Sequence, residues 1–186
     1  MNKKIRRCLS LLLVAAMVVT GLDFVPAKAA ETTYTSGDYT YTLNGDDEAT
    51  ITKYDGSASY VAIPSTLDGK QVVGIGDGVF QDKKTITGVN IPEGIKSIGH
   101  DAFAYTNLQE LKLPTSLEDI GYSILYGVKG ITSIDIPNKL KIARSYGNGD
   151  GPFAGSKIKE VTFENGITKI PDNVMNKCTE LEKVSL

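Results

Sequence analysis

One pattern of apolar and polar positions recurs along most of the chain: a triplet whose outer residues are apolar and whose middle residue is in most cases polar. The six triplets are residues 61–63, 89–91, 111–113, 134–136, 161–163 and 184–186. Alternation with a period of two sends the outer side chains into a core and the middle one outward, as in a short β-strand. A proline follows each of the first four triplets and, lacking an N–H, ends the strand ladder: Pro64, Pro92, Pro114 and Pro137.

The triplets belong to a longer repeating unit. Their last residues are 28, 22, 23, 27 and 23 positions apart, a period typical of leucine-rich repeats, whose units are roughly 20–29 residues long. An aliphatic residue three positions before each of the last five triplets completes an L-x-x-L-x-L spacing: Ile86, Leu108, Ile131, Ile158 and Leu181. One unit cannot bury its apolar side chains alone, so stacked neighbours must cover it. The pattern predicts a mainly β, right-handed solenoid of about five coils over residues 60–186, with a parallel sheet on one face.

The segment after each triplet has its own pattern. Aliphatic residues three apart follow the proline, as in Ile95 and Ile98, and a large apolar residue comes five positions later: Phe80, Phe103, Leu125 and Met175. Glycines follow the second aliphatic residue, where we expect the chain to turn: Gly76, Gly99 and Gly121. In the fourth coil Phe153 lies eleven positions after Ile142. Its longer loop, residues 144–151, is expected to project from the convex side or a rim.

A stretch within the repeats carries a family resemblance. Residues 91–103, Ile-Pro-Glu-Gly-Ile-Lys-Ser-Ile-Gly-His-Asp-Ala-Phe, resemble the BspA-type leucine-rich repeat of bacterial surface proteins. The family pattern runs I-P-x-x-V-x-x-I-G-x-x-A-F and continues with a Cys or Thr, a slot that Thr106 and Cys178 fill here. The resemblance extends over residues 60–186. It implies an exported or surface-attached protein, often with further domains, that takes part in adhesion and in host or matrix binding.

Residues 30–59 precede the first triplet and do not follow the repeat pattern. Residues 39–43 and 49–52 alternate around a turn at 44–47, which predicts a β-hairpin. We expect this hairpin to cap the first coil. Five tyrosines gather there and are expected to pack across the strands, with a carbohydrate platform as the alternative: Tyr34, Tyr39, Tyr41, Tyr54 and Tyr60.

At the other end, the last triplet is followed by neither a proline nor a polar cap. An uncovered coil exposes a sheet edge and an apolar face, which favours association. The sequence therefore predicts either a piece of a longer protein or edge-to-edge self-association through the C-terminal coil.

Residues 1–29 predict a cleaved secretory signal peptide. Four basic residues stand at positions 3, 4, 6 and 7, an apolar run occupies 9–22, and Ala-Lys-Ala at 27–29 matches the small-x-small cleavage pattern. The run is shorter than the roughly 20 apolar residues of a membrane span. We therefore expect a secreted or cell-surface protein with no membrane insertion after cleavage.

The net charge of the chain limits the kinds of partner it can bind. Cleavage would leave 15 basic and 21 acidic residues, a net charge of −6 against −2 for the whole chain. This acidity argues against nucleic acid or an anionic membrane surface as the main partner. Only Cys178 would remain, so no internal disulfide could form.

Groups that could carry catalysis are few. His100, the single histidine, is expected to be an exposed turn residue. Cys178 is expected to be an inert packed thiol, with a reactive thiol as the alternative. The loop at 148–150 lacks the spacing and bidentate glutamate of a calcium loop, and the glycine-rich stretch 74–78 opens no helix that could hold a phosphate. We expect no enzymatic activity, no cofactor and no metal site.

The remaining candidate site is the strip of outward positions on the triplet strands, the concave recognition surface of leucine-rich repeats. It comprises Asn90, Glu110, Lys112, Ser133, Asp135, Glu160 and Thr162. The strip is polar and lacks the aromatic anchors of binding hot spots, which points to avidity from a longer array or to binding elsewhere on the same protein. We expect a non-catalytic binding or adhesion module toward an extracellular or host protein or glycan. The alternative is a structural spacer or substrate-recruitment arm of a longer cell-wall-associated or enzymatic protein.

Overall fold

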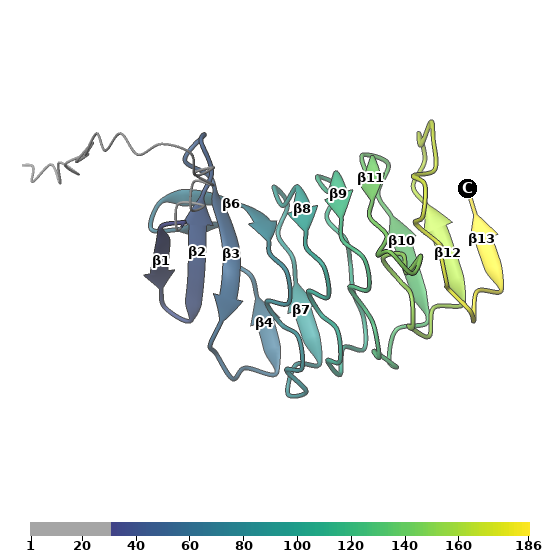
Figure 1. Ribbon diagram of the computed structural model, residues 1–186, viewed down its shortest axis with the longest axis horizontal. Coiled ribbons are helices and arrows are strands. Elements are labelled where there is room, and N and C mark those ends of the chain that lie inside the picture. The colour runs from purple at the N-terminus through teal and green to yellow at the C-terminus, as the bar shows by residue number, and fades with distance from the viewer. Residues whose placement is uncertain (1–30) are drawn as a thin grey trace, which may run out of the picture. The chain divides into compact units, whose positions relative to one another are not determined.

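Short strands joined by tight turns make up the part of the chain that the computed structural model describes, residues 31–186 (Figure 1). Within this range there is no helix. The strands are β1 (Thr33–Ser36), β2 (Tyr39–Leu43), β3 (Ala49–Tyr54), β4 (Tyr60–Ala62), β5 (Thr66–Leu67), β6 (Lys70–Ile75), β7 (Gly88–Asn90), β8 (Ser97–Ile98), β9 (Asp119–Ile120), β10 (Ser133–Ile136), β11 (Ile142–Ala143), β12 (Glu160–Phe163) and β13 (Lys183–Ser185). The predicted fold class, a mainly β solenoid of stacked coils with an N-terminal β-cap, is confirmed.

The triplets line one side of the solenoid, here called the triplet face. Strand β4 pairs with β7, and β10, β12 and β13 form a second group, all in parallel. On β10, Ile134 and Ile136 are buried while Ser133 and Asp135 are exposed. This is the alternation that the triplet pattern predicts.

A second parallel sheet runs along the other edge of the stack, where Figure 1 places β8, β9 and β11. Its order is β3-β6-β8-β9-β11, and Ile75, Ile98 and Ile120 stand in register on successive strands. The sequence predicted a parallel sheet on one face only. Strands of two residues, such as β8, are too short to show an alternation, so the second sheet gave no strand signal.

The glycines that follow these strands serve close packing. The sequence placed them where the chain must turn, yet Gly76, Gly99 and Gly121 do not have positive φ. Adjacent coils approach here instead: a Cβ on Gly121 would lie 2.5 Å from the carbonyl carbon of Gly99. The Gly121 N–H donates a hydrogen bond to the Ile98 carbonyl at 2.7 Å. The missing side chain therefore allows neighbouring coils to hydrogen-bond at this point.

A column of large apolar side chains fills the centre of the stack. Four of them are fully buried: Phe80, Phe103, Leu125 and Phe153. The rings of Phe80 and Phe103 stack with centroids 5.3 Å apart and planes 1° from parallel, and Tyr54 of the cap continues the column. Met175, predicted to belong to this column, is half-buried, and the neighbouring Val174 is the residue that is fully buried.

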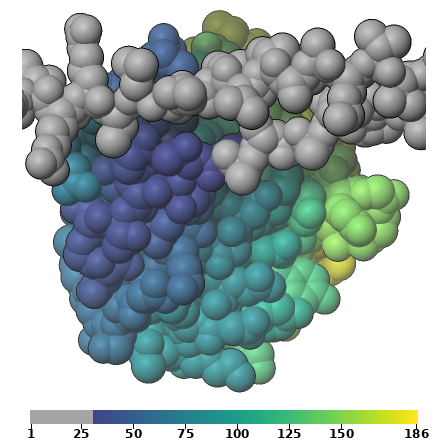
Figure 2. All heavy atoms as spheres, turned by 60° about the vertical axis from the view of Figure 1, so that its left-hand side comes forward, coloured from purple at the N-terminus to yellow at the C-terminus, as the bar shows by residue number. Residues whose placement is uncertain are grey.

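The N-terminal cap has one strand more than the predicted hairpin. β1, β2 and β3 form an antiparallel meander, and β3 then pairs in parallel with β6, which joins the cap to the second sheet. Figure 2 looks onto this end, where β1 and β2, in purple, lie across the stack. The tyrosines pack across the strands, with ring centroids 5.4 Å apart for Tyr34 and Tyr41 and 5.1 Å for Tyr39 and Tyr54. Tyr60 lies apart from them, on β4.

The predicted signal peptide, residues 1–29, lies outside the described residues. Between residues 31 and 186, no helix is long and apolar enough to cross a membrane.

Candidate binding surface

All seven residues predicted for the outward strip are exposed: Asn90, Glu110, Lys112, Ser133, Asp135, Glu160 and Thr162. On the C-terminal half of the triplet face they stand in register, with Ser133 beside Glu160 and Asp135 beside Thr162. Glu160 in turn lies beside Lys183, whose Nζ is 3.4 Å from its Oε2. Exposed ion pairs of this kind contribute about 1 kcal/mol at most. These polar side chains can therefore exchange their present partners for those of a ligand at little cost.

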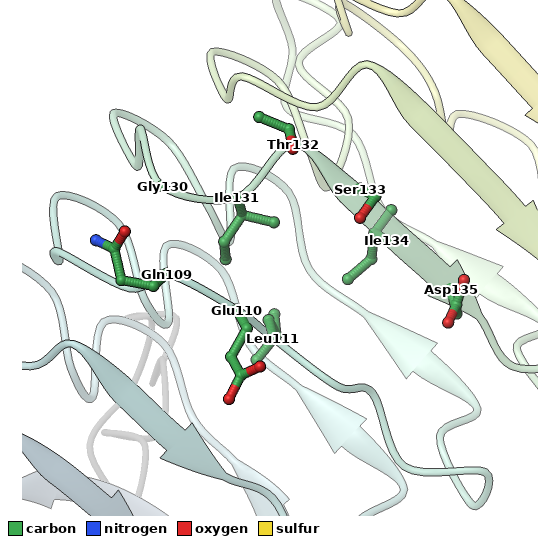
Figure 3. A pocket seen from close by; sticks show the side chains of 9 residues that line it. All are labelled: Gln109, Glu110, Leu111, Gly130, Ile131, Thr132, Ser133, Ile134 and Asp135. Carbon is green, nitrogen blue, oxygen red and sulfur yellow. The ribbon is translucent and has the colours of Figure 1, made fainter.

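The triplet sheet is interrupted at the third triplet. Among residues 31–186, no backbone hydrogen bond joins residues 110–113 to the coil on either side. Figure 3 shows this segment as a plain loop next to strand β10. Buried Leu111 and Leu113 still fix it to the core, and the N–H of the preceding Gln109 donates to the Thr87 carbonyl at 3.1 Å. This segment is thus held by its two buried side chains and by the bond of the preceding residue, while its own peptide groups make no backbone hydrogen bond to either adjacent coil.

Two hollows open beside this segment. The first, of about 190 Å³, lies between it and β10 and is lined in part by Glu110, Ser133 and Asp135 (Figure 3). The second, of about 220 Å³, lies between it and β7 and is lined in part by Asn90 and Lys112. Unpaired peptide N–H and C=O groups are strong hydrogen-bonding sites. Five of the seven predicted residues therefore lie on or beside a stretch of backbone whose hydrogen-bonding groups are unused.

The rim of the second hollow carries a fixed negative charge. Glu93 accepts hydrogen bonds from the Thr115 N–H at 3.1 Å and from the Thr115 hydroxyl at 2.9 Å. These bonds to the ionised form, that of the backbone N–H first, hold the pKa of Glu93 below its ordinary value. With Lys112 opposite, this hollow presents both signs of charge.

His100 and Cys178, the two candidate reactive side chains, both pack against neighbouring side chains. His100 is half-buried and not an exposed turn residue as expected, because its ring stacks on Tyr122 at a centroid distance of 3.8 Å and its Nδ1 accepts a hydrogen bond from the Tyr122 N–H at 3.1 Å. Cys178 packs against the core, and burial raises the pKa of its thiol to about 11. Within the described range 31–186, no group of three or more His, Cys, Asp or Glu side chains is arranged to hold a metal ion.

Sequence reasoning missed a cluster of four tyrosine side chains, three of them exposed. The rings of Tyr105 and Tyr126 lie 5.5 Å apart, and those of Tyr122 and Tyr146 lie 5.1 Å apart. A signal for the first pair was present, because these two tyrosines are 21 positions apart. That is close to one repeat length, which places them on adjacent coils. Tyr146 belongs to the inserted loop, whose path the repeat pattern does not predict.

Comparison with known proteins agrees with this architecture. The family model of the BspA type Leucine rich repeat region matches residues 73–186 in six copies. The crystal structure of a leucine-rich repeat protein from Bacteroides capillosus ATCC 29799 is 32% identical, covers 73% of this chain and 100% of its own, and superposes with a TM-score of 0.61. A leucine-rich repeat protein from Bacteroides ovatus ATCC 8483 is 28% identical over 89% of this chain and 41% of its own, with a TM-score of 0.52.

A more distant structure shares the fold. The leucine-rich repeat protein of T. pallidum is 22% identical, covers 83% of this chain and 82% of its own, and has a TM-score of 0.58. A search among curated proteins finds no match. The family model begins within β6 and runs through β13, so it includes strands of both parallel faces. The chain therefore belongs to the BspA-type leucine-rich repeat family.

Proposed function

We propose that this chain is an exported, non-catalytic binding module whose triplet face attaches to an extracellular or host macromolecule. The observation that carries the proposal is the interrupted triplet sheet. An uninterrupted sheet would use its peptide groups within the fold, whereas residues 110–113 present theirs unpaired between two hollows. Membership in a family of bacterial surface repeat proteins supports a role in interactions between macromolecules.

An extended polypeptide segment of a partner fits this chemistry best. Main-chain hydrogen bonds supply affinity when a peptide lies against an open strand edge, and side chains beside it supply specificity. Here Glu110, Lys112 and Asp135 provide charges of both signs next to the open backbone. Complementary charges on a partner would speed association and exclude partners of the wrong pattern.

Binding to extracellular-matrix proteins tests the proposal. Purified chain would be applied to immobilised collagen, laminin and fibronectin, and saturable binding to at least one is expected. The triple variant Glu110→Ala, Lys112→Ala, Asp135→Ala should bind at least about tenfold more weakly, a loss of about 1.4 kcal/mol. The control variant Lys169→Ala, Asp172→Ala removes an exposed ion pair elsewhere and should bind like the parent.

The outcomes separate the parts of the proposal. Equal binding by the triple variant would remove the triplet face as the binding site. Binding of the parent to none of the three proteins would overturn the role in matrix adhesion.

Export is tested separately. Expression of the whole chain in a bacterium should yield a secreted or surface-bound product whose N-terminus, by mass spectrometry, is Ala30. A cytoplasmic product that retains residues 1–29 would overturn this part.

A further inference from the structure

A hollow rich in tyrosine lies beside the inserted loop 144–151 and contains no residue of any triplet. Its volume is about 420 Å³, within the range of roughly 300–1,000 Å³ that is usual for small-ligand sites. Four tyrosines line it: Tyr105, Tyr122, Tyr126 and Tyr146. We call it the tyrosine hollow. It is separate from the surface assigned to the proposed function.

The fold holds two of these rings in place. A Cβ on Gly127 would lie 2.7 Å from the Tyr105 ring, and a Cβ on Gly155 would lie 2.5 Å from the Tyr126 ring. Both glycines have positive φ, 73° and 67°, so both their conformation and their lack of a side chain suit the position. Each tyrosine ring thus rests on the glycine of the next coil. Tyr105 is still 43% exposed and Tyr126 39% exposed, so both rings, whose planes lie 66° apart, remain accessible to a ligand.

The inserted loop supplies a further wall. It stands out from the flank of the stack in light green in Figure 2. The Tyr146 N–H donates to the Asp150 carbonyl at 3.0 Å, which closes the loop on itself. The Asp150 carboxylate is fixed by the Asn148 amide at 2.9 Å and by the Lys177 ammonium at 3.0 Å. The loop thereby presents Tyr146, which is 57% exposed, against Tyr122 in a defined orientation.

The hollow also carries polar groups without partners. Within residues 31–186, none of the four tyrosine hydroxyls makes a hydrogen bond, and neither does the Asp101 carboxylate or the Gln81 side-chain amide. The charge of Asp150 is matched by Lys177, so Asp101 is the carboxylate in the hollow that has no ion pair. The lining therefore combines open ring surfaces with hydrogen-bond donors and acceptors and contains no aliphatic side chain.

We infer that the tyrosine hollow binds a neutral saccharide, whose C–H-bearing ring faces stack on Tyr105 and Tyr126 and whose hydroxyls hydrogen-bond to Asp101 and the tyrosine hydroxyls. A pyranose ring has an apolar face and a polar rim, which matches rings that are amphipathic in the same way. An apolar peptide would leave the carboxylate and the hydroxyls without partners, which opposes its binding. A carboxylate such as Asp101 forms a charge-assisted hydrogen bond to a sugar hydroxyl, which is stronger than a hydrogen bond between two neutral groups.

Titration calorimetry with neutral oligosaccharides tests the inference. The probes are the tetrasaccharides of β-linked glucose, α-linked glucose, mannose and N-acetylglucosamine, each added to the full chain. Saturable binding of at least one is expected. Tyr126→Ala should weaken it by at least about tenfold, whereas Tyr126→Phe, which keeps the ring, should weaken it by less.

Two matched variants make the test specific. Tyr60→Ala also removes an exposed tyrosine that covers a glycine, Gly88, but outside the hollow, and it should leave saccharide binding unchanged. Asp101→Asn suits the positive φ of 52° at this position and should weaken binding while the circular dichroism spectrum stays that of the parent. The triple variant of the triplet face should bind saccharide normally, which separates this inference from the proposed function.

Three results would overturn the inference. The first is no saturable binding of any of the four tetrasaccharides by the parent chain. The second is an equal loss in Tyr60→Ala and Tyr126→Ala. The third is binding of tetramethylammonium or an arginine-rich peptide at the hollow in place of the sugars, since tyrosine rings beside a carboxylate also attract cations.

Discussion

The spacing of the coils along the second sheet leads to a sharp prediction for Gly121→Ala. The added Cβ would lie 2.5 Å from both the Gly99 carbonyl carbon and the His100 nitrogen, whereas non-bonded heavy atoms pack best at roughly 3.5–4.0 Å. The two coils must then separate by about 1 Å. The hydrogen bond from Gly121 N–H to the Ile98 carbonyl, now 2.7 Å, would be stretched past the usual limit of about 3.2 Å.

The steric clash and the stretched hydrogen bond together set the expected loss in the free energy of unfolding. Overpacking in a rigid interior costs about 1–3 kcal/mol, and the net loss of one backbone hydrogen bond adds about 1 kcal/mol. We therefore expect Gly121→Ala to lower the free energy of unfolding by about 2–4 kcal/mol, measured by urea denaturation of the full chain with circular dichroism.

Gly147→Ala and Gly45→Ala are the matched controls. A Cβ at either position would meet no atom within 4 Å, and neither glycine has positive φ. They should leave stability unchanged or raise it by about 0.4–1 kcal/mol through the unfolded state. If Gly121→Ala stayed within about 0.5 kcal/mol of the parent, or if the controls lost as much, the close contact between coils would not be what requires glycine here.

Three further predictions rest on single features. With Cys8 replaced by serine, Cys178 should react with iodoacetamide at pH 8 at least about tenfold more slowly than a free thiol, because burial raises its pKa to about 11 and so lowers the thiolate fraction, and urea should abolish the difference. Lys141 donates a hydrogen bond to Glu118 and lowers the pKa of its carboxyl below 4.5. The stability that this bond contributes is therefore present above pH 4.5 and is lost as the pH falls through the pKa of the folded state. Thermal melts from pH 3 to 7 should show a smaller loss of stability in acid for Glu118→Gln than for the parent. Exposed Val184 and Leu186 should drive concentration-dependent association in size-exclusion chromatography, and the double change to lysine should reduce it; a parent that stays monomeric at every concentration would contradict this.

The repeat itself could be predicted from the sequence because its signal is physical and redundant. The triplet of β10 shows the reason: Ile134 and Ile136 must be apolar to be buried, while Ser133 and Asp135 must tolerate water. Each further triplet repeats the same constraint at the same spacing. The exposed strip follows from this alternation, so its residues were predictable as exposed positions.

Other features depend on distances between coils, which a one-dimensional pattern does not contain. A glycine required by a neighbouring backbone and one required by a turn look alike in the sequence, which is why Gly121 was attributed to a turn. His100 was expected at the surface because nothing local shows that the ring of Tyr122 covers it. The third triplet has the same apolar pattern as the others, yet residues 110–113 are unpaired, and no property of their side chains predicts that.

Both candidate sites lie where the solenoid departs from its own regularity. In a regular coil the peptide groups pair with the neighbouring coils, so only side chains remain to recognise a partner. At residues 110–113 the triplet face lacks that backbone pairing. At residues 144–151 an insertion adds side chains that a regular repeat unit does not have. The first departure is tolerated because the same coil is held on its other edge, where β9 pairs with both β8 and β11. The continuous second sheet therefore holds this coil in the stack although residues 110–113 of the triplet face lack strand pairing.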